Sequence, residues 1–539
     1  MRDYADAYRE FSMADLERRA LGQSLDGGLN VAVACCDCWA DEGRVALNFV
    51  AKDFSRETVT FKQLQVDSSR FANLLTSRGI GRGDVVAGLL PRVPELLTVI
   101  LGVWRVGAIY QPLFTAFGPA AIQSRVTSKG GSRAKLIVTD AANLPKLDDV
   151  ADAPPTLLVD RGQPNATAFA DALAAQSEVF APVKLGADDP FIMLFTSGTT
   201  GSPKGVRHPL RLLLAAAAYL LDGVDLRPGD SYWNVADPGW AYGLYYAIIA
   251  PLLLGHAATF FEGAFAVDNA LYVIKTLRID NLAAAPTAYR AMMAAGDAAF
   301  ADMCGQLRVA SSAGEPLNPE VVRWAERVLG CPLGDHYGQT EIGMVINNHH
   351  GFRQAVRPGS AGLAMPGFDL AVLDDSLRPV APDVSGVLAV RRATSPLLTF
   401  NGYWLADTPQ LTEEWYVTGD TMSRDADGYF YFAGRNDDII TSSGYRIGPF
   451  DVESVMIEHP AVAEVAVIGK PDPERTEIVK SFVVLRKGYQ ASDALGAELR
   501  EHVRKRLSLH ACPREVEFME ELPKTASGKV QRFLLRGRG

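Results

Sequence analysis

Apolar runs and apolar-striped segments alternate along most of the chain, and this alternation predicts its secondary structure. Residues 85–90 form a short apolar run that predicts a strand, and residues 94–109 follow with the apolar stripe of a helix. Further strands are predicted at residues 134–139 and 191–195, and a further apolar helix at residues 212–221. Strands that alternate with helices in this way favour a layered α/β architecture.

The pattern changes near residue 363 and restarts after residue 438. Short strands with turns, expected at residues 369–373 and 386–390, indicate a small β subdomain. The tail predicts helices at residues 450–459 and 494–507, and strands at residues 463–469 and 480–485. About 100 residues suffice for a separate core. We therefore expect an α/β chain of multidomain α+β organisation, with an N-terminal domain at residues 1–435 and a C-terminal domain at residues 436–539.

Composition narrows the partners of the chain. Its 539 residues are 48% hydrophobic and 22% charged, which is ordinary globular usage, and the length exceeds one usual core. The formal net charge of −10 disfavours nucleic acid and anionic membranes as partners. Local basic sites are therefore expected to serve small anions.

Cysteine usage and the apolar segments indicate a compartment. Cys35, Cys36 and Cys38 lie close together, but no second Cys or His pair stands at zinc spacing, so we expect buried or incidental thiols. Acids near the N-terminus argue against a signal peptide, and the stretches 212–221 and 247–254 fall short of the roughly 20 residues of a membrane span. These features predict a soluble cytoplasmic protein.

Residues 196–205 read T-S-G-T-T-G-S-P-K-G and directly follow the predicted strand 191–195. Glycines let backbone N–H groups approach an anion, and the hydroxyls and the Lys204 ammonium add donors and positive charge. The segment is not a G-x-x-x-x-G-K-[ST] loop, because Lys204 is followed by Gly205. A plain surface turn is the alternative. We expect an ATP site of a different architecture.

Four further segments complete a pattern with this loop. They read Y-G-Q-T-E at residues 337–341, Y-V-T-G-D at 416–420, G-R-N-D-D-I-I at 434–440 and P-K-T-A-S-G-K at 523–529. In this order and spacing, over nearly the whole chain, they resemble the AMP-forming acyl-adenylate superfamily of acyl-CoA synthetases, luciferases and adenylation domains. The text S-S-G-Y-R-I-G-P at residues 442–449 is similar to that of short- and medium-chain acyl-CoA synthetases.

The resemblance implies a ligase that uses ATP, Mg²⁺ and CoA in fatty-acid or lipid metabolism. Such an enzyme converts a carboxylic acid to acyl-AMP and pyrophosphate and then transfers the acyl group to CoA. It implies a large domain of layered α/β sheets with a small β subdomain, followed by a small mobile C-terminal domain. Two alternatives stay open: an adenylation enzyme that serves a separate carrier protein, and a catalytically silent binding protein on this fold.

The resemblance also implies roles for single residues. Thr196 and Lys204 would act on the β- and γ-phosphates, and Glu341 would bind Mg²⁺. Lys529 would act on the α-phosphate and the acyl carboxylate, where a compact ammonium charge suits an oxyanion. Standing alone, Glu341 and Lys529 would be ordinary solvated charges. The other expected nucleotide contacts are Ser197, Gly198, Thr199, Thr200, Gly201, Gly314, Glu315, Pro316, Gln339 and Thr340, with Tyr337 on adenine and Asp420 and Arg435 on the ribose.

The small domain would rotate between the two half-reactions, with Asp437 at the hinge. The expected CoA contacts are Ser443, Gly444, Tyr445, Arg446 and Arg475, with Arg506 and Arg514 as weaker candidates. Residues 508–514 read S-L-H-A-C-P-R where many relatives read A-P-Y-x-Y-P-R. The context of Lys529 also resembles sites that are silenced by lysine acylation, which implies a lysine acyltransferase and a deacylase as partners.

Small residues at the expected acyl pocket indicate which acid is activated. Acetate-specific relatives carry Trp where this chain has Gly338, and Ala313 and Ala241 are also small. Trp240 would form one wall, and Tyr242 could shorten the tunnel again. Pocket volume decides chain length. We expect monocarboxylic acids from propionate to medium-chain, including branched or aromatic ones, with an acetate- or propionate-specific ligase as the alternative.

Overall fold

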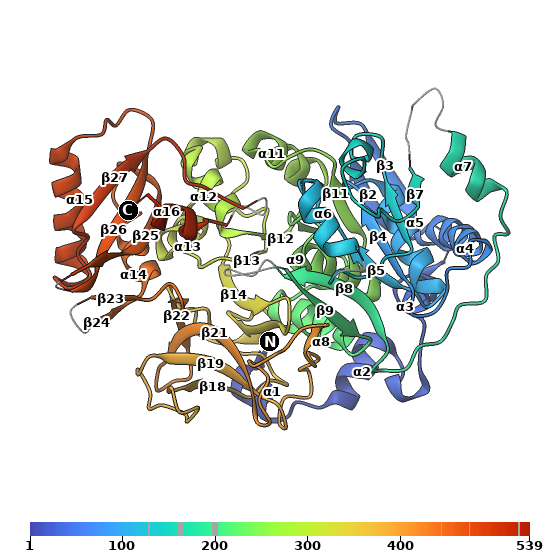
Figure 1. Ribbon diagram of the computed structural model, residues 1–539, viewed down its shortest axis with the longest axis horizontal. Coiled ribbons are helices and arrows are strands. Elements are labelled where there is room, and N and C mark those ends of the chain that lie inside the picture. The colour runs from blue at the N-terminus through green and yellow to red at the C-terminus, as the bar shows by residue number, and fades with distance from the viewer. Residues whose placement is uncertain are drawn as a thin grey trace.

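The structure is a computed structural model that describes residues 1–41, 43–127, 130–159, 167–196, 203–442, 445–473, 475–525 and 529–538. Figure 1 shows the sheets and helices of the first 435 residues spread over the right, the centre and the lower left of the view, and the last hundred residues gathered at the left above them. β14, which carries Tyr337, is labelled near the centre of the view.

The sheet on the right of Figure 1 is parallel in its centre and antiparallel at one edge. Its inner strands are nearly continuous apolar runs, as expected for strands covered on both faces. α4 (Phe61–Ser77) and α5 (Pro94–Arg105) pack against each other, and α5 contacts the sheet through Trp104, whose indole donates to the Phe191 carbonyl. In spatial order the strands are β20 (Tyr403–Trp404), β9 (Lys204–Pro209), β8 (Pro190–Thr196), β5 (Ile109–Pro112), β4 (Val85–Leu89), β6 (Leu136–Thr139) and β7 (Thr156–Leu158).

A second sheet starts with parallel strands and ends with antiparallel ones. Its order is β10 (Tyr232–Asn234), β12 (Asn281–Ala284), β13 (Val309–Ala313), β14 (Leu333–Gln339), β15 (Gly343–Asn347) and β17 (Leu363–Ala364). A smaller sheet joins β11 (Ala258–Phe261), β2 (Val45–Val50) and β3 (Arg56–Thr60), and β1 (Arg2–Asp3) pairs with β16 (Phe352–Arg353). In open α/β sheets, ligands bind beyond the carboxyl ends of parallel strands. The ends of β5, β8, β10, β13 and β14 therefore indicate where a site is expected.

The remaining helices of this part connect the strands. They are α1 (Tyr4–Arg9), α2 (Met13–Leu21), α3 (Val31–Cys35), α6 (Pro119–Val126), α7 (Thr167–Ala174), α8 (Leu212–Ala218), α9 (Ala241–Gly243), α10 (Ala250–Leu253), α11 (Val267–Thr276), α12 (Pro286–Ala294) and α13 (Pro319–Trp324). π-Helical turns extend three of them: η4 (Tyr219–Gly223), η5 (Leu244–Ile249) and η7 (Ala325–Leu329). No helix in the described ranges is long and apolar enough to cross a membrane.

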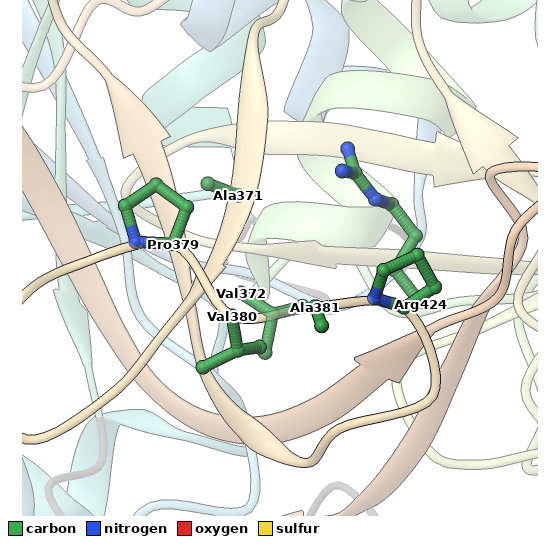
Figure 2. Close-up of a pocket in the computed structure, with 7 residues that line it drawn as sticks. Ala371, Val372, Pro379, Val380, Ala381 and Arg424 are labelled. Atoms are coloured by element: carbon green, nitrogen blue, oxygen red, sulfur yellow. The ribbon is translucent and has the colours of Figure 1, made fainter.

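The small β subdomain is an antiparallel sheet of β18 (Leu370–Leu373), β19 (Gly386–Arg391), β21 (Trp415–Arg424) and β22 (Phe430–Arg435). A hollow on it is lined by Ala371, Pro379, Val380 and Ala381 and by the stem of Arg424 (Figure 2). Its volume is about 10 Å³, which is room for about one water molecule. This hollow is therefore too small to be a substrate site.

The chain after residue 438 has cores of its own on both faces of a sheet. The sheet orders β24 (Tyr445–Ile447), β23 (Ile440–Ser442), β26 (Thr476–Leu485) and β25 (Val462–Asp472), with β27 (Glu515–Met519) added to β26. α14 (Pro449–Met456) and α15 (Asp493–Arg506) share a buried cluster with Val467 on one face. α16 (Arg532–Arg536) contributes Leu535 to a cluster with Ala466 and Ile468 on the other. Successive residues of β25 thus point to opposite faces.

The expected strands and helices are present, but some of their ends were predicted wrongly. The helix expected over residues 94–109 ends at Arg105, because Gly107 adopts a left-handed φ of +72° and Ile109 already begins β5. The helix expected over residues 212–221 is α-helical only to Ala218 and continues as the π-helical turn η4. Neither β27 nor α16 was predicted from the sequence.

Candidate active site

The ends of β8 and β9 form a hairpin neck that holds two of the predicted phosphate residues. Thr196, the last residue of β8, is the register partner of Lys204, the first residue of β9, and its hydroxyl donates to the Lys204 carbonyl at 3.4 Å. We call this pair of strand ends the phosphate hairpin. The predicted contacts between them, Ser197, Gly198, Thr199, Thr200 and Gly201, lie outside the described residues.

Asp420 is the centre of a hydrogen-bonded group that we call the nucleotide cluster, made of Tyr337, Gln339, Asp420 and Arg435. The Tyr337 hydroxyl donates to Asp420 Oδ2 at 2.5 Å, and Gln339 Nε2 donates to the same oxygen at 2.7 Å. An Arg435 nitrogen donates to Oδ1 at 3.0 Å. The structure therefore brings together four predicted residues from three strands: β14, β21 and β22.

The nucleotide cluster is buried around one negative charge. Asp420 is 4% exposed, and the backbone reaches it through Gly419, which has a left-handed φ of +74° that favours glycine. Burial opposes the charge of Arg435, but Asp420 and Asp437 outweigh it and raise the guanidinium pKa. Burial, followed by the Asp420 charge, raises the pKa of Tyr337 well above its usual value, so the phenol stays a donor.

Tyr403 contacts both Glu341, the predicted Mg²⁺ ligand, and Lys204, a predicted phosphate contact. The Tyr403 hydroxyl donates to Glu341 Oε1 at 2.8 Å, and the Lys204 ammonium lies 4.8 Å from the centre of the Tyr403 ring. Glu341 is 8% exposed. Burial raises its pKa, and the hydrogen bond from Tyr403 opposes that rise. Tyr403, which lies in the short strand β20, was not predicted as a site residue.

The loop after β13 carries the predicted residues Gly314, Glu315 and Pro316. Gly314 has a left-handed φ of +99°, and Glu315 accepts from Arg290 at 2.8 Å and from the Thr287 hydroxyl at 2.9 Å. These contacts hold the loop against the start of α12.

Asp335 is a further acceptor that sequence reasoning missed. It stands on β14 two residues before Tyr337, so both side chains share one face of the strand. Its Oδ1 is buried without a hydrogen-bond partner in the described part of the chain, and burial raises its pKa well above the usual range. The carboxyl group could accept from an amino group of a ligand beside Tyr337.

The predicted acyl residues lie at the ends of β5 and β10 and against the β14–β15 turn. Trp240 packs on Phe114 and Phe117 with ring centroids 5.3 and 5.5 Å apart, and we call these three rings the aromatic wall. The two phenylalanines were missed because they follow β5, far from Trp240 in sequence. Ala241 and Tyr242 lie in α9, which continues as the π-helical turn η5. In η5, the Tyr246 hydroxyl accepts a hydrogen bond from the Met344 N–H of β15.

Gly338 and Ala313 are both enclosed, but for different reasons. Ala313 is 1% exposed at the end of β13. A Cβ at Gly338 would lie 2.1 Å from the Gly343 carbonyl oxygen, at the point where the β14–β15 register shifts. The backbone around residue 338 therefore requires glycine at this position.

Lys529 precedes α16, and the described CoA-side residues Tyr445 and Arg475 lie in β24 and between β25 and β26. Lys529 is exposed, its N–H donates to the Thr525 hydroxyl at 3.1 Å, and no contact in the described ranges joins its ammonium to the nucleotide cluster. Tyr445 is 49% exposed and stacks on His510 with ring centroids 3.7 Å apart. Arg475 donates its N–H to Asp472. Ser443, Gly444 and the Arg446 side chain lie outside the described part of the structure. Of the weaker candidates, Arg506 pairs with Glu458, and the Arg514 N–H donates to the Val479 carbonyl.

The last helix is tied to the predicted hinge. Arg536 donates to the Asp437 carbonyl at 3.2 Å and to Asp438 Oδ1 at 2.5 Å. Arg532, three residues after Lys529, pairs with Glu453 of α14 at 2.7 Å. These contacts hold the Lys529 segment to the hinge and to α14.

α14 in turn meets the loop of the first domain that follows Glu315. Asn318 donates to the Ser454 hydroxyl at 3.3 Å, and Arg323 pairs with Glu458 at 3.5 Å. The C-terminal domain is thus in contact with the side of the nucleotide site that carries residues 314–316.

A larger cavity, of about 300 Å³, lies away from this site between α2, α3 and α10. None of the predicted site residues lines it. Its two arginines, Arg18 and Arg19, are paired with Asp15 at 2.8 Å and Asp222 at 2.7 Å. The candidate active site is therefore the region at the strand ends, where the phosphate hairpin, Glu341 and the nucleotide cluster come together.

Comparison with known proteins gives the family. The model of the AMP-binding enzyme matches residues 39–404, and the model of the AMP-binding enzyme C-terminal domain matches residues 451–529. The chain is 37% identical to acetyl-coenzyme A synthetase of Bacillus subtilis (strain 168), over 99% of this chain and 95% of the relative. Among solved structures, an acyl-CoA synthetase of Brucella canis is 52% identical with a TM-score of 0.80, covering 100% of this chain and 99% of its own.

The anthranilate CoA ligase AuaEII in complex with anthranoyl-AMP is 28% identical with a TM-score of 0.86, covering 96% of this chain and 98% of its own. The family model, the relatives and the folds agree with the motifs read from the sequence. The chain therefore belongs to the AMP-binding enzyme family and is one of its AMP-forming acyl-CoA synthetases, enzymes that join an acid to CoA through an acyl-AMP and use ATP and Mg²⁺.

Proposed function

We propose that the nucleotide cluster, Glu341 and the phosphate hairpin together form the adenylation site of this acid–CoA ligase. The observation that carries the proposal is that Lys204 and Glu341 both contact Tyr403. This shared contact brings a cation that could bind phosphate close to a carboxylate that could bind Mg²⁺. Tyr337 offers an aromatic face to adenine, and Asp420 and Arg435 offer an acceptor and donors to the ribose hydroxyls. The four nucleotide-cluster residues are already hydrogen-bonded to one another, so little ordering remains for binding.

The residues present fit Mg²⁺. Glu341 is a buried carboxylate that uses Oε1 for Tyr403, and a carboxylate has about four lone-pair sites, so capacity for a metal remains. Mg²⁺ is usually held by one or two carboxylates together with substrate phosphates. Consistent with that, no group of three or more His, Cys, Asp or Glu ligands occurs in the part of the chain that the structure describes. When bound, the metal neutralises phosphate charge.

The protein's own part in acyl-AMP formation is mainly electrostatic. Lys204 would hold the β- and γ-phosphates of the departing pyrophosphate, with Thr196 beside it. Lys529 would place its ammonium on the α-phosphate and the acyl carboxylate, where negative charge must be stabilised as the new anhydride forms. This role requires the segment of Lys529 to stay at the edge of the first domain, and the contact of α14 with Asn318 supports that arrangement.

We propose that the C-terminal domain begins at residue 436 and rotates about Asp437 after adenylation. The contacts of Arg536 with Asp437 and Asp438 support a hinge at this point, because they link the last helix to it. Rotation would withdraw Lys529 and bring the CoA-side residues to the acyl-AMP. The exposed stack of Tyr445 on His510 offers a flat surface for CoA in the segment where the sequence departs from many relatives.

We propose that the acid is a monocarboxylate larger than acetate, from propionate to medium-chain, including branched and aromatic acids. The aromatic wall of Trp240, Phe114 and Phe117 supports it, since it offers an apolar surface at the predicted acyl site. The anthranilate ligase accommodates an aromatic acyl-adenylate on the same fold. The acetyl-coenzyme A synthetase relative makes acetate the competing candidate.

A panel of acids tests this choice. Wild-type protein with ATP, Mg²⁺ and CoA is given acetate, propionate, butyrate, hexanoate, isobutyrate, benzoate and anthranilate, and AMP release is measured. Each methylene that the pocket buries is worth about 0.8 kcal/mol, or about a fourfold gain in kcat/KM. A monotonic gain from acetate to at least butyrate is expected. A kcat/KM that is highest for acetate would refute the larger pocket.

A separate carrier protein remains the rival acceptor of the acyl group. Comparison of free CoA with a phosphopantetheinylated carrier as the acceptor distinguishes the two, and thioester on CoA alone supports the ligase.

We also propose a cytoplasmic location, which the free thiols of Cys35 and Cys36 suit. Acylation of Lys529 by a lysine acyltransferase would remove its charge, and a deacylase would restore it. An acylated Lys529 that retains full adenylation activity would contradict this regulation.

A further inference from the structure

Tyr403 occupies a position between two residues that the adenylation reaction needs. Its hydroxyl is 2.8 Å from Glu341 Oε1, and its ring centre is 4.8 Å from the Lys204 ammonium. We propose that Tyr403 is a positioning residue, which aims the metal carboxylate with its hydroxyl and holds the phosphate lysine on its ring. The proposal rests on the proposed function, because it takes Glu341 as the metal residue and Lys204 as the phosphate residue.

The surroundings of Tyr403 fix it firmly. β20 pairs with β9 in the register Tyr403 to Val206 and Trp404 to Gly205, so Tyr403 belongs to the same hairpin sheet as Lys204. Its N–H donates to the Thr408 hydroxyl at 2.8 Å. Its ring meets Phe400 edge-on, with centroids 5.0 Å apart. A side chain held by backbone pairing and by ring packing can impose its orientation on a partner.

The chemistry of the two contacts suits positioning. A phenol donates one hydrogen bond, and this bond fixes one carboxylate oxygen while leaving lone pairs for a metal ion. Burial, followed by the Glu341 charge, raises the pKa of Tyr403, so the phenol remains a donor at neutral pH. Partners that orient metal-binding carboxylates in this way are typically worth 10- to 100-fold in metal affinity. The ring offers Lys204 a cation–π contact.

Tyr403→Phe separates the two roles, because it removes the hydroxyl and keeps the ring. We expect the Mg²⁺ concentration for half-maximal pyrophosphate exchange to rise about 10- to 100-fold, with activity restored at high Mg²⁺. Thioester formation from supplied acyl-AMP should not change. Tyr403→Leu should further raise the KM for ATP about two- to fivefold, because the ring under Lys204 is lost.

Binding of Mn²⁺ provides a readout that does not depend on turnover. The protein is titrated with Mn²⁺ in the presence of a non-hydrolysable ATP analogue, and free Mn²⁺ is followed by electron paramagnetic resonance. Tyr403→Phe should weaken Mn²⁺ binding about 10- to 100-fold and leave metal-free binding of the analogue unchanged. The matched control is Tyr431→Phe, which removes a tyrosine hydroxyl that donates to Asp425 at 3.2 Å on the small β sheet. The control should keep wild-type Mn²⁺ binding.

The outcomes separate this inference from the proposed function. Unchanged Mn²⁺ binding in Tyr403→Phe, or an activity loss that is equal in both half-reactions and not restored by Mg²⁺, overturns the positioning role. If none of the acids in the panel supports pyrophosphate exchange by the wild-type protein, the proposed function is wrong. The Mn²⁺ titration still decides whether Tyr403 positions Glu341.

Discussion

Replacement of Asp420 by asparagine tests the nucleotide cluster with the smallest change of shape. Oδ2 accepts from Tyr337 at 2.5 Å and from Gln339 at 2.7 Å, and Oδ1 accepts from Arg435 at 3.0 Å. Every partner is therefore a donor. An asparagine amide must turn its NH₂ toward one of these two sets, so at least one set loses its acceptor whichever way the amide is placed.

The expected loss of AMP affinity is set by the more favourable of the two orientations of the asparagine amide. If the NH₂ replaces Oδ1, the bond to Arg435 is lost, and a hydrogen bond to a charged group is worth about 1.5–3 kcal/mol. The bonds from Tyr337 and Gln339 become neutral and weaken as well. We therefore expect a total of about 3 kcal/mol, or about 100-fold, in AMP affinity, if the cluster forms the platform for adenine and ribose.

Isothermal titration of AMP measures this loss, and Asp425→Asn is the matched control. Asp425 also accepts from an arginine and a tyrosine, Arg357 and Tyr431, but it lies outside the nucleotide cluster. Both variants should lose thermal stability, and only Asp420→Asn should lose AMP affinity. Wild-type AMP affinity in Asp420→Asn, with the same stability loss as the control, would refute the reasoning.

Two substitutions and a pH titration test Lys529, Gly338 and two buried histidines. Lys529→Ala should lower carboxylate-dependent pyrophosphate exchange by at least about 100-fold and spare thioester formation from supplied acyl-AMP, whereas equal loss in both would contradict its role. Gly338→Ala should lower the free energy of unfolding by about 1–3 kcal/mol, since the new Cβ would lie 2.1 Å from a β15 carbonyl oxygen. Gly81→Ala is the control, because a Cβ there would meet nothing within 4 Å. Equal melting temperatures of the two variants would count against the backbone constraint. Burial lowers the pKa of His349 and of His350 to about 4. As the pH falls below about 6.5, these histidines bind protons in the unfolded chain but not yet in the folded protein. The stability of the folded protein is therefore full above that pH and is lost as the pH falls toward 4. The two together should contribute about 4 kcal/mol to the stability lost between pH 7 and pH 5, and the buried His208 and His336 add to the loss in the same direction; chemical denaturation measures the total, and a flat profile would show that these rings are not buried and neutral.

The sequence predicted the parts of the fold that local pattern determines. The run at residues 191–195 became β8, because a strand covered on both faces needs a continuous apolar run. The motif segments gave Tyr337, Asp420 and Arg435, which the structure joins although they are nearly a hundred residues apart. The end of α5 was predicted wrongly, because a left-handed glycine at 107 interrupts an apolar stripe that continues into β5.

The missed residues share a physical cause. Tyr403, Phe114 and Asp335 act through contacts with residues distant in sequence, and a lone tyrosine, phenylalanine or aspartate carries no periodic or spacing signal. Tyr403 reaches Glu341 only because β20 pairs with β9, a pairing set by tertiary structure. Gly338 was interpreted as pocket space alone, because the bulge that brings Gly343 against it is visible only in three dimensions.

Carboxylate-dependent ATP–pyrophosphate exchange in the absence of CoA is the direct test of an adenylation site in this protein. We expect exchange that requires Mg²⁺ and an acid, is greater for an acid larger than acetate, and yields AMP and thioester once CoA is added. ATP turnover that is independent of the acid, or exchange that no acid supports, would contradict an adenylation site at the phosphate hairpin and nucleotide cluster.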